Sequence, residues 1–588
     1  MCGIFGYIGK KKNAGAIVLE GLKILEYRGY DSWGIATVNK GKIIIQKKAG
    51  KLEDSQITDL PESNIALGHT RWATHGGVTD INAHPHLDCD GKIAIIHNGI
   101  IENYASLKKR LVNQGHIFIS DTDTEVAVHL IEDLKKDGKN FLDAVILAFN
   151  QFEGLNAIIV MDGSSQTMVA AKNGSPLVVG KGTKENFIAS DAPALIKHTR
   201  IVHFMEDGEI IEITGEKIKS FLLKSGKPNI ISWRTINWRF AHIDKGRYPH
   251  FMLKEIHEQP HVIRTILEDS ESSVKDLASL IKNSYGTYLV ACGTAAYAGL
   301  AGTYLFSKIA KRHINYAVGS EFGYQLDFLK KKSLIIALSQ SGETIDVIDA
   351  VKRAKDKGAT IYALVNALGS TLYRLADYKI LLLAGPEKAV ASTKAFTAKL
   401  GFLILLAYCL PNRLPDGKKV LAGAIVAMED ILKDGLPNIK DVADKIVSSE
   451  HIFVIGRGLA YPIALEGALK IKEVSYIHAE GMASGELKHG PIALVEEGTP
   501  CIAFLPNDET YGANLVGAME MKARGAYIIG ISYQSHELFD SFIPIKDCGE
   551  ASIIPETMVV QLLAYYLSIQ KGIDPDKPRN LAKSVTVK

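Results

Sequence analysis

Three short apolar segments in the second half of the chain recur in the same order at a nearly constant interval. The matched pairs, offset by 164, 167 and 167 residues, are Val290–Thr294 with Val454–Gly458, Ser333–Leu338 with Pro500–Leu505, and Gly358–Leu364 with Gly525–Ile531. Each apolar segment is followed by a longer helical stretch, which is the pattern of a parallel sheet covered by helices. The repeat therefore predicts two copies of one α/β domain.

The two copies differ directly after their second strand. Copy one continues with Ser339-Gln340-Ser341-Gly342-Glu343-Thr344 and a helix, whereas copy two has Pro506-Asn507-Asp508-Glu509. A helix cap is the plainer interpretation of the hydroxyl-rich segment. Hydroxyl and N–H groups at a helix N-terminus also bind phosphate, however, and the acidic residues of copy two would repel it. The contrast predicts one phosphate site per chain, in copy one.

The first half of the chain is expected to be rich in β-structure. Alternating or β-branched runs predict strands at 3–8, 35–38, 43–46, 93–97, 157–161 and 167–171, with helices near 15–26 and 124–135. Periodicity is lost over 225–245, which favours a linker. We expect domains at 1–230, 266–425 and 426–575, a linker at 231–265 and a C-terminal tail at 576–588.

Composition argues against several classes of protein. The 68 Lys and Arg residues nearly balance the 65 Asp and Glu residues, so nucleic acid and anionic membranes are not expected partners. The six cysteines are scattered, which disfavours a disulfide framework and favours a cytoplasmic location. The longest strongly apolar run, Leu400–Leu410, is about half a membrane span. The N-terminus has no signal-peptide pattern.

Residues near the N-terminus have the chemistry of a nucleophilic site. Removal of Met1 would place a thiol and a free α-amine on Cys2, a nucleophile with its own base, although an inert terminal cysteine is the plainer interpretation. Arg71 lies in the dense segment Gly68–Gly76 and could bind a carboxylate in bidentate fashion. A strand ending at Asn98-Gly99 could supply an oxyanion hole.

Histidines and acids in this half have further interpretations. The spacing of the five histidines His69, His75, His84, His86 and His97 fits no zinc signature, so we expect hydrogen bonding at strand ends, no metal ligand and no cofactor. Thr122 and Glu125 form the pattern of a capping box. Asp123, beside that cap, could bind an ammonium group.

The motifs together resemble a known family. Five segments of the first half resemble the glutaminase domain of the N-terminal-nucleophile amidotransferases: Met1–Ile4, Leu25–Ser32, His69–Gly76, His97–Asn103 and Ser120–Glu125. Five segments of the second half resemble paired sugar-isomerase (SIS) domains: Ala291–Thr294, Leu338–Thr344, Ala391–Thr397, Gly485–Pro491 and Pro578–Val587. In this order the motifs are similar to the glutamine:fructose-6-phosphate aminotransferase (isomerising) family, the glucosamine-6-phosphate synthases. The resemblance implies an α/β and α+β multidomain fold, an αββα sandwich followed by two parallel-sheet αβα sandwiches.

The resemblance assigns roles in the first half. Cys2 would attack the glutamine carboxamide, with Asn98 and Gly99 stabilising the oxyanion. The matched glutamine-binding positions are Arg71, Trp72, Thr74, His75 and Asp123. The released ammonia would pass to the sugar site through an internal channel gated by Trp72, because water would protonate it.

The resemblance also assigns roles in the second half. Matched positions for fructose 6-phosphate are Thr294, Ser339, Gln340, Ser341, Thr344, Val390, Ser392, Lys470 and Ala582. Lys583 would form a Schiff base with the ketose, and Glu473 would move the proton between C1 and C2. His489 would open the sugar ring across the interface of a homodimer. Independently, the spacing of Glu466, Lys470 and Glu473 places them on one helix face. The implied products are glucosamine 6-phosphate, the first intermediate of amino-sugar synthesis, and glutamate.

Three positions depart from the family pattern, and two alternatives remain. Ala295 stands in place of a serine, Trp33 in place of a small residue and Pro249 in place of an arginine, which bears on sugar affinity and domain coupling. A phosphoribosyl amidotransferase would share the glutaminase half but needs a diphosphate loop instead of the repeat. A sugar-phosphate-sensing SIS protein with a degenerate glutaminase domain would not need a lysine in the tail.

Overall fold

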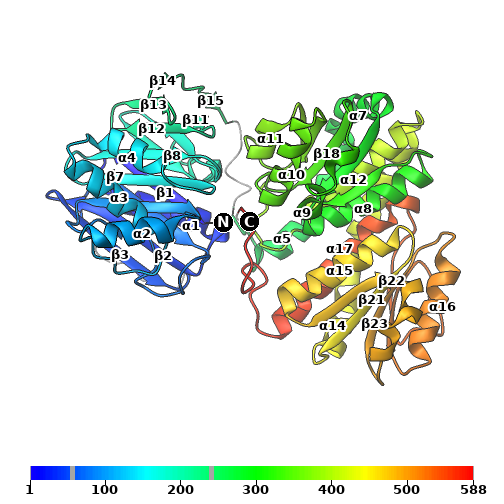
Figure 1. Cartoon of the computed structure of the whole chain (residues 1–588). Helices are drawn as coiled ribbons and strands as arrows, with labels where there is room; N and C mark the ends of the chain where they lie inside the picture. Colours follow the sequence, from blue (N-terminus) through cyan, green and yellow to red (C-terminus); the bar gives the residue numbers. More distant parts are fainter. Residues whose placement is uncertain (1, 53–59, 237–243, 587–588) are drawn as a thin grey trace. The chain divides into compact units, whose positions relative to one another are not determined.

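The computed structural model describes residues 2–52, 60–236 and 244–586. It divides the chain into two compact units (Figure 1). The first comprises Met1–His242 with Ser584–Lys588, and the second comprises Ile243–Lys583. Each unit contains two of the four sheets, and the sheets differ in strand direction between the units.

Two antiparallel sheets form the first unit. The larger has the order β15 (Arg234–Thr235), β11 (Ile201–Phe204), β9 (Val178–Lys181), β10 (Glu185–Ala189), β1 (Gly3–Gly9), β4 (Ile65–Arg71), β2 (Ser32–Asn39), β3 (Lys42–Ala49). The other has the order β14 (Pro228–Asn229), β13 (Ile218–Leu222), β12 (Glu209–Ile213), β8 (Thr167–Lys172), β7 (Asn156–Asp162), β6 (Ile93–Gly99), β5 (His86–Leu87).

Helices cover the outer faces of these sheets. Apolar side chains of both sheets form one shared core, which includes Ile4 and Ile159. The helix α1 (Ala14–Leu25) packs on β1 and β4, while α3 (Thr124–Lys136) and α4 (Phe141–Phe149) share a second core with the other sheet. The layers are thus helix, sheet, sheet and helix, which confirms the predicted αββα sandwich.

The predicted linker at 225–245 contains the boundary between the two units. It also contains the short strands β14 and β15, which are too short to produce a detectable alternation; residues 237–243 lie outside the described residues. The capping box of Thr122 and Glu125 does not form. The Glu125 carboxylate instead accepts hydrogen bonds from the N–H groups of Ile119 (2.7 Å) and Ser120 (2.7 Å), because the preceding loop folds back over the helix end.

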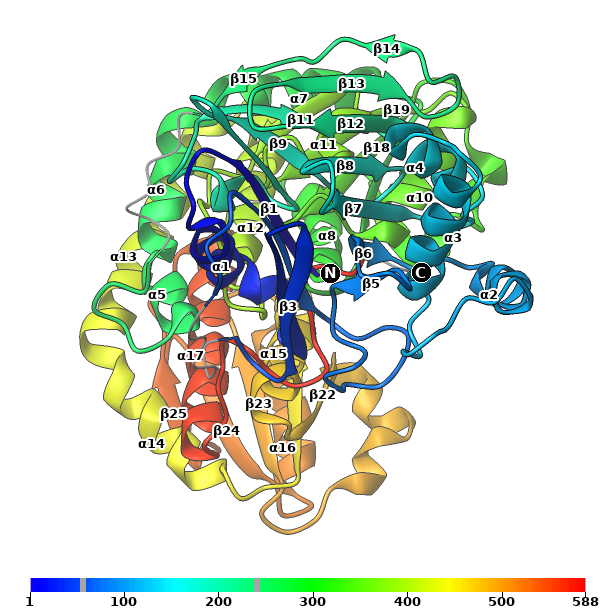
Figure 2. The same ribbon diagram turned by 90° about the vertical axis from the view of Figure 1, so that its left-hand side faces the viewer.

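The second unit contains two parallel sheets with the same topology. One has the order β17 (Asn315–Val318), β16 (Gly286–Ala291), β18 (Ser333–Ser339), β19 (Thr360–Val365), β20 (Tyr378–Leu381). The other has the order β22 (His478–Ala483), β21 (His451–Gly456), β23 (Pro500–Leu505), β24 (Tyr527–Ser532), β25 (Ser541–Pro544) (Figure 2). The repeated segments fall on equivalent strands of the two sheets, which confirms the predicted duplication.

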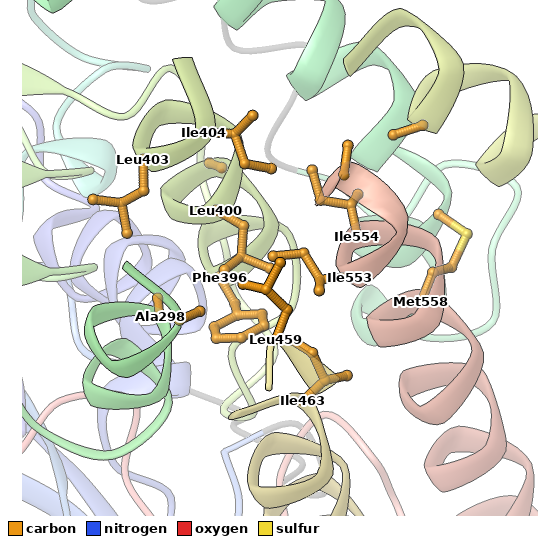
Figure 3. Packing of buried hydrophobic residues seen from close by; sticks show 14 of the residues in the cluster. Ala298, Phe396, Leu400, Leu403, Ile404, Leu459, Ile463, Ile553, Ile554 and Met558 are labelled. Atoms are coloured by element: carbon orange, nitrogen blue, oxygen red, sulfur yellow. The ribbon is translucent and has the colours of Figure 1, made fainter. Parts of the chain in front are cut away.

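Apolar helices form the centre of the second unit. They are α8 (Gly293–Lys308), α12 (Lys394–Cys409), α15 (Ala460–Ser475) and α17 (Ile553–Gln570), and Figure 3 shows their side chains in contact. Every residue of α12 is buried, including Lys394 and Lys399 in its otherwise largely apolar sequence. The segment Gly549–Gln570 is long and apolar enough to span a membrane, but 89% of its most apolar window is buried in the structure. It is therefore packed as a core helix.

Candidate active sites

A pocket in the first unit contains all the glutamine-site residues proposed from the sequence. Its wall includes Cys2, Arg71, Trp72, Thr74, His75, Asn98, Gly99 and Asp123. The register of β1 against β4 pairs Gly3 with Thr70, so Cys2 reaches the end of β4 beside Trp72. The Trp72 N–H donates to Cys2 Sγ at 3.2 Å. Burial raises the pKa of the Cys2 thiol, although the Trp72 hydrogen bond and the Arg71 charge act to lower it. The thiol therefore needs a base to become nucleophilic.

Hydrogen bonds fix the orientation of the Asn98 amide. His69 Nε2 lies 3.0 Å from the His97 carbonyl oxygen and 3.1 Å from Asn98 Oδ1, so this nitrogen carries a proton and donates to both. Burial lowers the pKa of His69 to about 3, which keeps the ring neutral. With its oxygen occupied, Asn98 directs Nδ2 toward the Cys2 carbonyl oxygen at 3.0 Å. The amide thus presents its donor to the residue that bears the thiol.

Only glycine suits position 99. Its φ is +138°, and an added Cβ would lie 2.3 Å from the Leu155 carbonyl oxygen. Because this conformation is essentially restricted to glycine, any side chain here would displace the end of β6. The residue therefore lets the backbone turn at the pocket, directly after Asn98.

Arg71 and Asp123 are buried and shape the pocket through backbone contacts. The guanidinium donates to the carbonyl oxygens of Gly77 (3.1 Å), Gly76 (3.1 Å) and His75, and so holds the loop after β4. An arginine has five N–H donors, so this loop contact does not use up its capacity to bind a carboxylate. Asp123 Oδ2 accepts the N–H of Ile101 at 2.7 Å, which leaves a second carboxylate oxygen for a cationic group.

A second pocket, of about 160 Å³, lies in the second unit at the carboxyl end of β18. It contains most of the proposed sugar-phosphate residues: Thr294, Ser339, Gln340, Ser341, Thr344, Val390, Ser392, Glu473, Ala582 and Lys583. The carboxyl ends of parallel strands are the usual position of ligand sites in such folds. Sequence reasoning placed these residues at one site although they lie up to about 290 residues apart.

The segment after β18 forms a tight loop before α10 (Ile345–Asp356). Ser339 Oγ accepts the Gly342 N–H at 2.9 Å, and Gly342 has a φ of +66°. The acidic member of the loop, Glu343, accepts the N–H of Thr371 at 2.8 Å. Its carboxylate is thereby engaged outside the pocket wall, and the hydroxyls and amide that remain in the wall suit a phosphate.

The equivalent loop of copy two is occupied by acidic residues. Asp508 accepts the Thr510 N–H at 2.8 Å, and Glu509 pairs with Lys308 at 2.9 Å. Two carboxylates in this loop would repel a phosphate, whereas the loop of copy one presents hydroxyls and an amide to its pocket.

Lys583 reaches the second pocket from the C-terminal tail. Its Nζ pairs with Glu387 Oε2 at 2.6 Å and donates to the Ala389 carbonyl oxygen at 2.8 Å. Burial would raise the pKa of Glu387, but Lys583 and the N–H groups of Thr393 and Ala395 hold it near 2. The carboxylate stays charged and fixes the position of the lysine.

Glu466, Lys470 and Glu473 of α15 lie on one helix face, as their spacing predicts, and only Glu473 reaches this pocket. Glu473 lies in the pocket wall, whereas Lys470 is fully buried behind it and contacts both Glu473 and Glu466. Lys470 is thus absent from the pocket wall, although it was assigned to substrate. Burial raises the pKa of Glu466 to about 8. His489 is exposed and does not line the pocket of its own chain.

Sequence reasoning missed several residues at the two pockets. His84, His97 and Thr124 line the first, and Cys292, Lys399 and Leu581 line the second. Lys399 is fully buried, and burial lowers its pKa to about 8. A lysine within the apolar run of α12 is the signal that could have identified it.

Comparisons with known proteins cover both units. A model of the SIS domain matches residues 280–408 and 445–542, and a model of the glutamine amidotransferase domain matches residues 53–220. The glutamine–fructose-6-phosphate aminotransferases (isomerising) of Pyrococcus horikoshii and Fusobacterium nucleatum are 44% and 43% identical, each over 100% of both chains.

A solved structure supports the same relationship for the second unit. The C-terminal domain of glucosamine-fructose-6-phosphate aminotransferase from Francisella tularensis is 33% identical, with a TM-score of 0.53, and covers 57% of this chain and 100% of its own. Together with the full-length relatives, this shows that the chain belongs to the glutamine–fructose-6-phosphate aminotransferase (isomerising) family.

Proposed function

We propose that the chain converts fructose 6-phosphate and glutamine to glucosamine 6-phosphate and glutamate. The observation that carries this proposal is the second pocket, where a buried lysine, a carboxylate and a hydroxyl-rich loop meet. A lysine is the group that forms a Schiff base with a ketose. The first pocket supplies the complementary chemistry, a thiol beside an oriented amide donor.

In the glutaminase reaction, Cys2 Sγ attacks the carboxamide carbon after its proton passes to the α-amine freed by loss of Met1. Asn98 Nδ2 and the backbone at Gly99 stabilise the oxyanion. Collapse of the tetrahedral intermediate releases ammonia and leaves a thioester, which water hydrolyses to glutamate. Arg71 and Asp123 bind the α-carboxylate and α-amine of the substrate.

In the isomerase reaction, the loop 339–344 binds the phosphate and Lys583 condenses with the C2 carbonyl, releasing water. Lys583 attacks as the neutral amine, after the ammonium paired with Glu387 passes a proton to solvent water. Ammonia replaces the lysine at C2. Glu473 then moves a proton from C1 to C2, which converts the ketose imine to the aldose amine. Lys470, behind Glu473, positions that carboxylate.

The remaining parts of the proposal concern the assembly. Ammonia passes internally, with Trp72 as the gate, and His489 opens the sugar ring in the active site of a partner subunit of a homodimer. Exposure of His489 within one chain supports a role at an interface. The six cysteines are free thiols, which supports a cytoplasmic location.

The test is to incubate the purified chain with glutamine and fructose 6-phosphate and to measure glucosamine 6-phosphate. Product should require both substrates. Lys583→Arg should eliminate the sugar product while glutamine hydrolysis stays measurable, because arginine cannot form the imine. A glutamine-analogue alkylator should label Cys2 and stop glutamine-dependent synthesis. Full synthase activity in Lys583→Arg would refute the Schiff-base role, and labelling of a different cysteine with activity retained would refute the glutaminase assignment.

A further inference from the structure

Four side chains with metal-binding groups meet in the first unit, away from the residues that line its pocket. They are Cys89, His116, His129 and Glu132, and one ligand atom of each lies within 4.8 Å of all the others. Cys89 is in the turn between β5 and β6, and His116 follows α2 (Tyr104–Asn113). His129 and Glu132 are three residues apart on α3, a spacing that places both on one helix face.

The distances between these atoms match a tetrahedral zinc site. Zinc–sulfur and zinc–nitrogen or –oxygen bond lengths imply separations of about 3.5 Å between sulfur and nitrogen ligands and about 3.3 Å between nitrogen and oxygen ligands. Cys89 Sγ lies 3.7 Å from His116 Nδ1 and 3.6 Å from His129 Nδ1. Glu132 Oε2 lies 3.2 Å from each of the same two nitrogens.

The surroundings complete the pattern of a metal site. Each histidine turns its other nitrogen to a carboxylate: His116 Nε2 is 3.5 Å from Asp133 Oδ1, and His129 Nε2 is 3.5 Å from Glu125 Oε1. Such outer carboxylates orient metal-bound imidazoles and raise their basicity. Lys136 binds the other Glu132 oxygen, Oε1, at 2.6 Å, which leaves Oε2 directed at the cluster. His116, His129 and Glu132 are buried, whereas Cys89 is exposed and gives an ion access from solvent.

We propose that Cys89, His116, His129 and Glu132 bind a zinc ion that fastens the β5–β6 turn to α3. One thiolate, two imidazoles and one carboxylate in a tetrahedral array form a donor set that favours zinc, whereas magnesium and calcium favour oxygen ligands. Four protein ligands leave no open position, so the ion is structural and takes no part in the reaction at either pocket. It joins two elements of the glutamine pocket, since β6 ends at Asn98-Gly99 and α3 begins after Asp123.

The test measures metal in the full chain, purified without a histidine tag. Mass spectrometry of the metal content should find about one zinc ion per chain, as expected for a site with four protein ligands. After removal of zinc by a chelator, added Co²⁺ should give the visible bands of tetrahedral cobalt and a near-ultraviolet thiolate-to-cobalt band. Cys89→Ser should lose the thiolate band and most of the zinc. The matched control Cys548→Ser, at a buried thiol of the second unit, should keep both.

A second variant separates metal binding from folding. Asp133→Asn leaves all four ligands in place but removes the outer carboxylate of His116, and should weaken zinc about 10- to 100-fold. Zinc should raise the melting temperature of the stripped wild-type chain and not that of Cys89→Ser. The proposal would be overturned if the wild-type chain held much less than one zinc ion and if its cobalt spectrum were the same as that of Cys89→Ser. The four side chains would then form only a hydrogen-bond network centred on Glu132.

Discussion

At the residue scale, the orientation of one amide sets the chemistry of the first pocket. Asn98→Asp keeps the shape of the side chain but replaces the Nδ2 donor with a second acceptor. We expect glutamine hydrolysis to lose about 10²- to 10³-fold in kcat, the usual effect of removing one oxyanion donor, with little change in KM. Steady-state kinetics with glutamine alone measures this. An unchanged kcat would show that Asn98 does not stabilise the oxyanion. The control is Asn64→Asp, which makes the same change at an exposed contact with Gln166.

Buried neutral histidines make the first unit sensitive to acid. The pKa of His69 is about 3 in the fold, mainly because of burial, against about 6.5 when unfolded. The unfolded chain therefore binds more protons below pH 6.5, so stability falls as the pH decreases through this range. His69 alone should cost about 2 kcal/mol between pH 6.5 and pH 5. Denaturant unfolding of the first unit at several pH values should show this slope, and His69→Gln should reduce it; an unchanged slope would contradict the assignment.

Single residues also mark the limit of sequence reasoning. Cys2, Asn98 and Lys583 were identified through motifs in which neighbouring residues share one function. Glu387 was not, because its role comes from contacts with a tail that is 196 residues distant in the chain. The cluster of Cys89, His116, His129 and Glu132 was missed for the same reason: its spacing matches no zinc signature, and only the packing of α3 against the β5–β6 turn brings it together.

At the scale of elements, the loops after β18 and β23 provide a matched comparison. Ser339→Ala removes the acceptor that fixes the Gly342 N–H and a hydroxyl from the pocket wall. Loss of a hydrogen bond to a charged group costs about 1.5–3 kcal/mol, so KM for fructose 6-phosphate should rise about 10- to 100-fold. Thr510→Ala, in the equivalent loop of copy two, should leave KM unchanged. Equal effects of the two variants would mean that the phosphate is not bound by the first loop.

The elements could be predicted in part. The repeat identified three strands of each parallel sheet because each buried central strand carries its own apolar run, but it did not identify the edge strands β17, β20, β22 and β25. Alternation identified the antiparallel strands β1, β2, β3, β6, β7 and β8. The other antiparallel strands were not predicted, and β5, β14 and β15 have only two residues each, which carry no period. The cap of α3 was misassigned because Glu125 bonds to the loop that precedes it, a contact that depends on how that loop folds back.

At the scale of the whole molecule, the role of His489 predicts that two defective chains restore each other. A site in the proposed dimer uses Lys583 of one chain and His489 of the partner. Refolded mixtures of His489→Ala and Lys583→Arg should therefore recover synthase activity, to about a quarter of wild type if chains pair at random and each mixed dimer has one intact site. Each variant alone should be inactive. No recovery in a mixture shown to contain mixed dimers would place both residues in sites formed within one chain.

The central claim is that nitrogen passes from glutamine to the sugar, and isotope labelling tests it most directly. The chain is supplied with fructose 6-phosphate, glutamine labelled with ¹⁵N in the amide, and an excess of unlabelled ammonium. Mass spectrometry of the product should show glucosamine 6-phosphate that retains the label, because ammonia moves internally between the two reactions. Product carrying the unlabelled nitrogen of the solution would contradict internal transfer, and the absence of glucosamine 6-phosphate would contradict the proposed function itself.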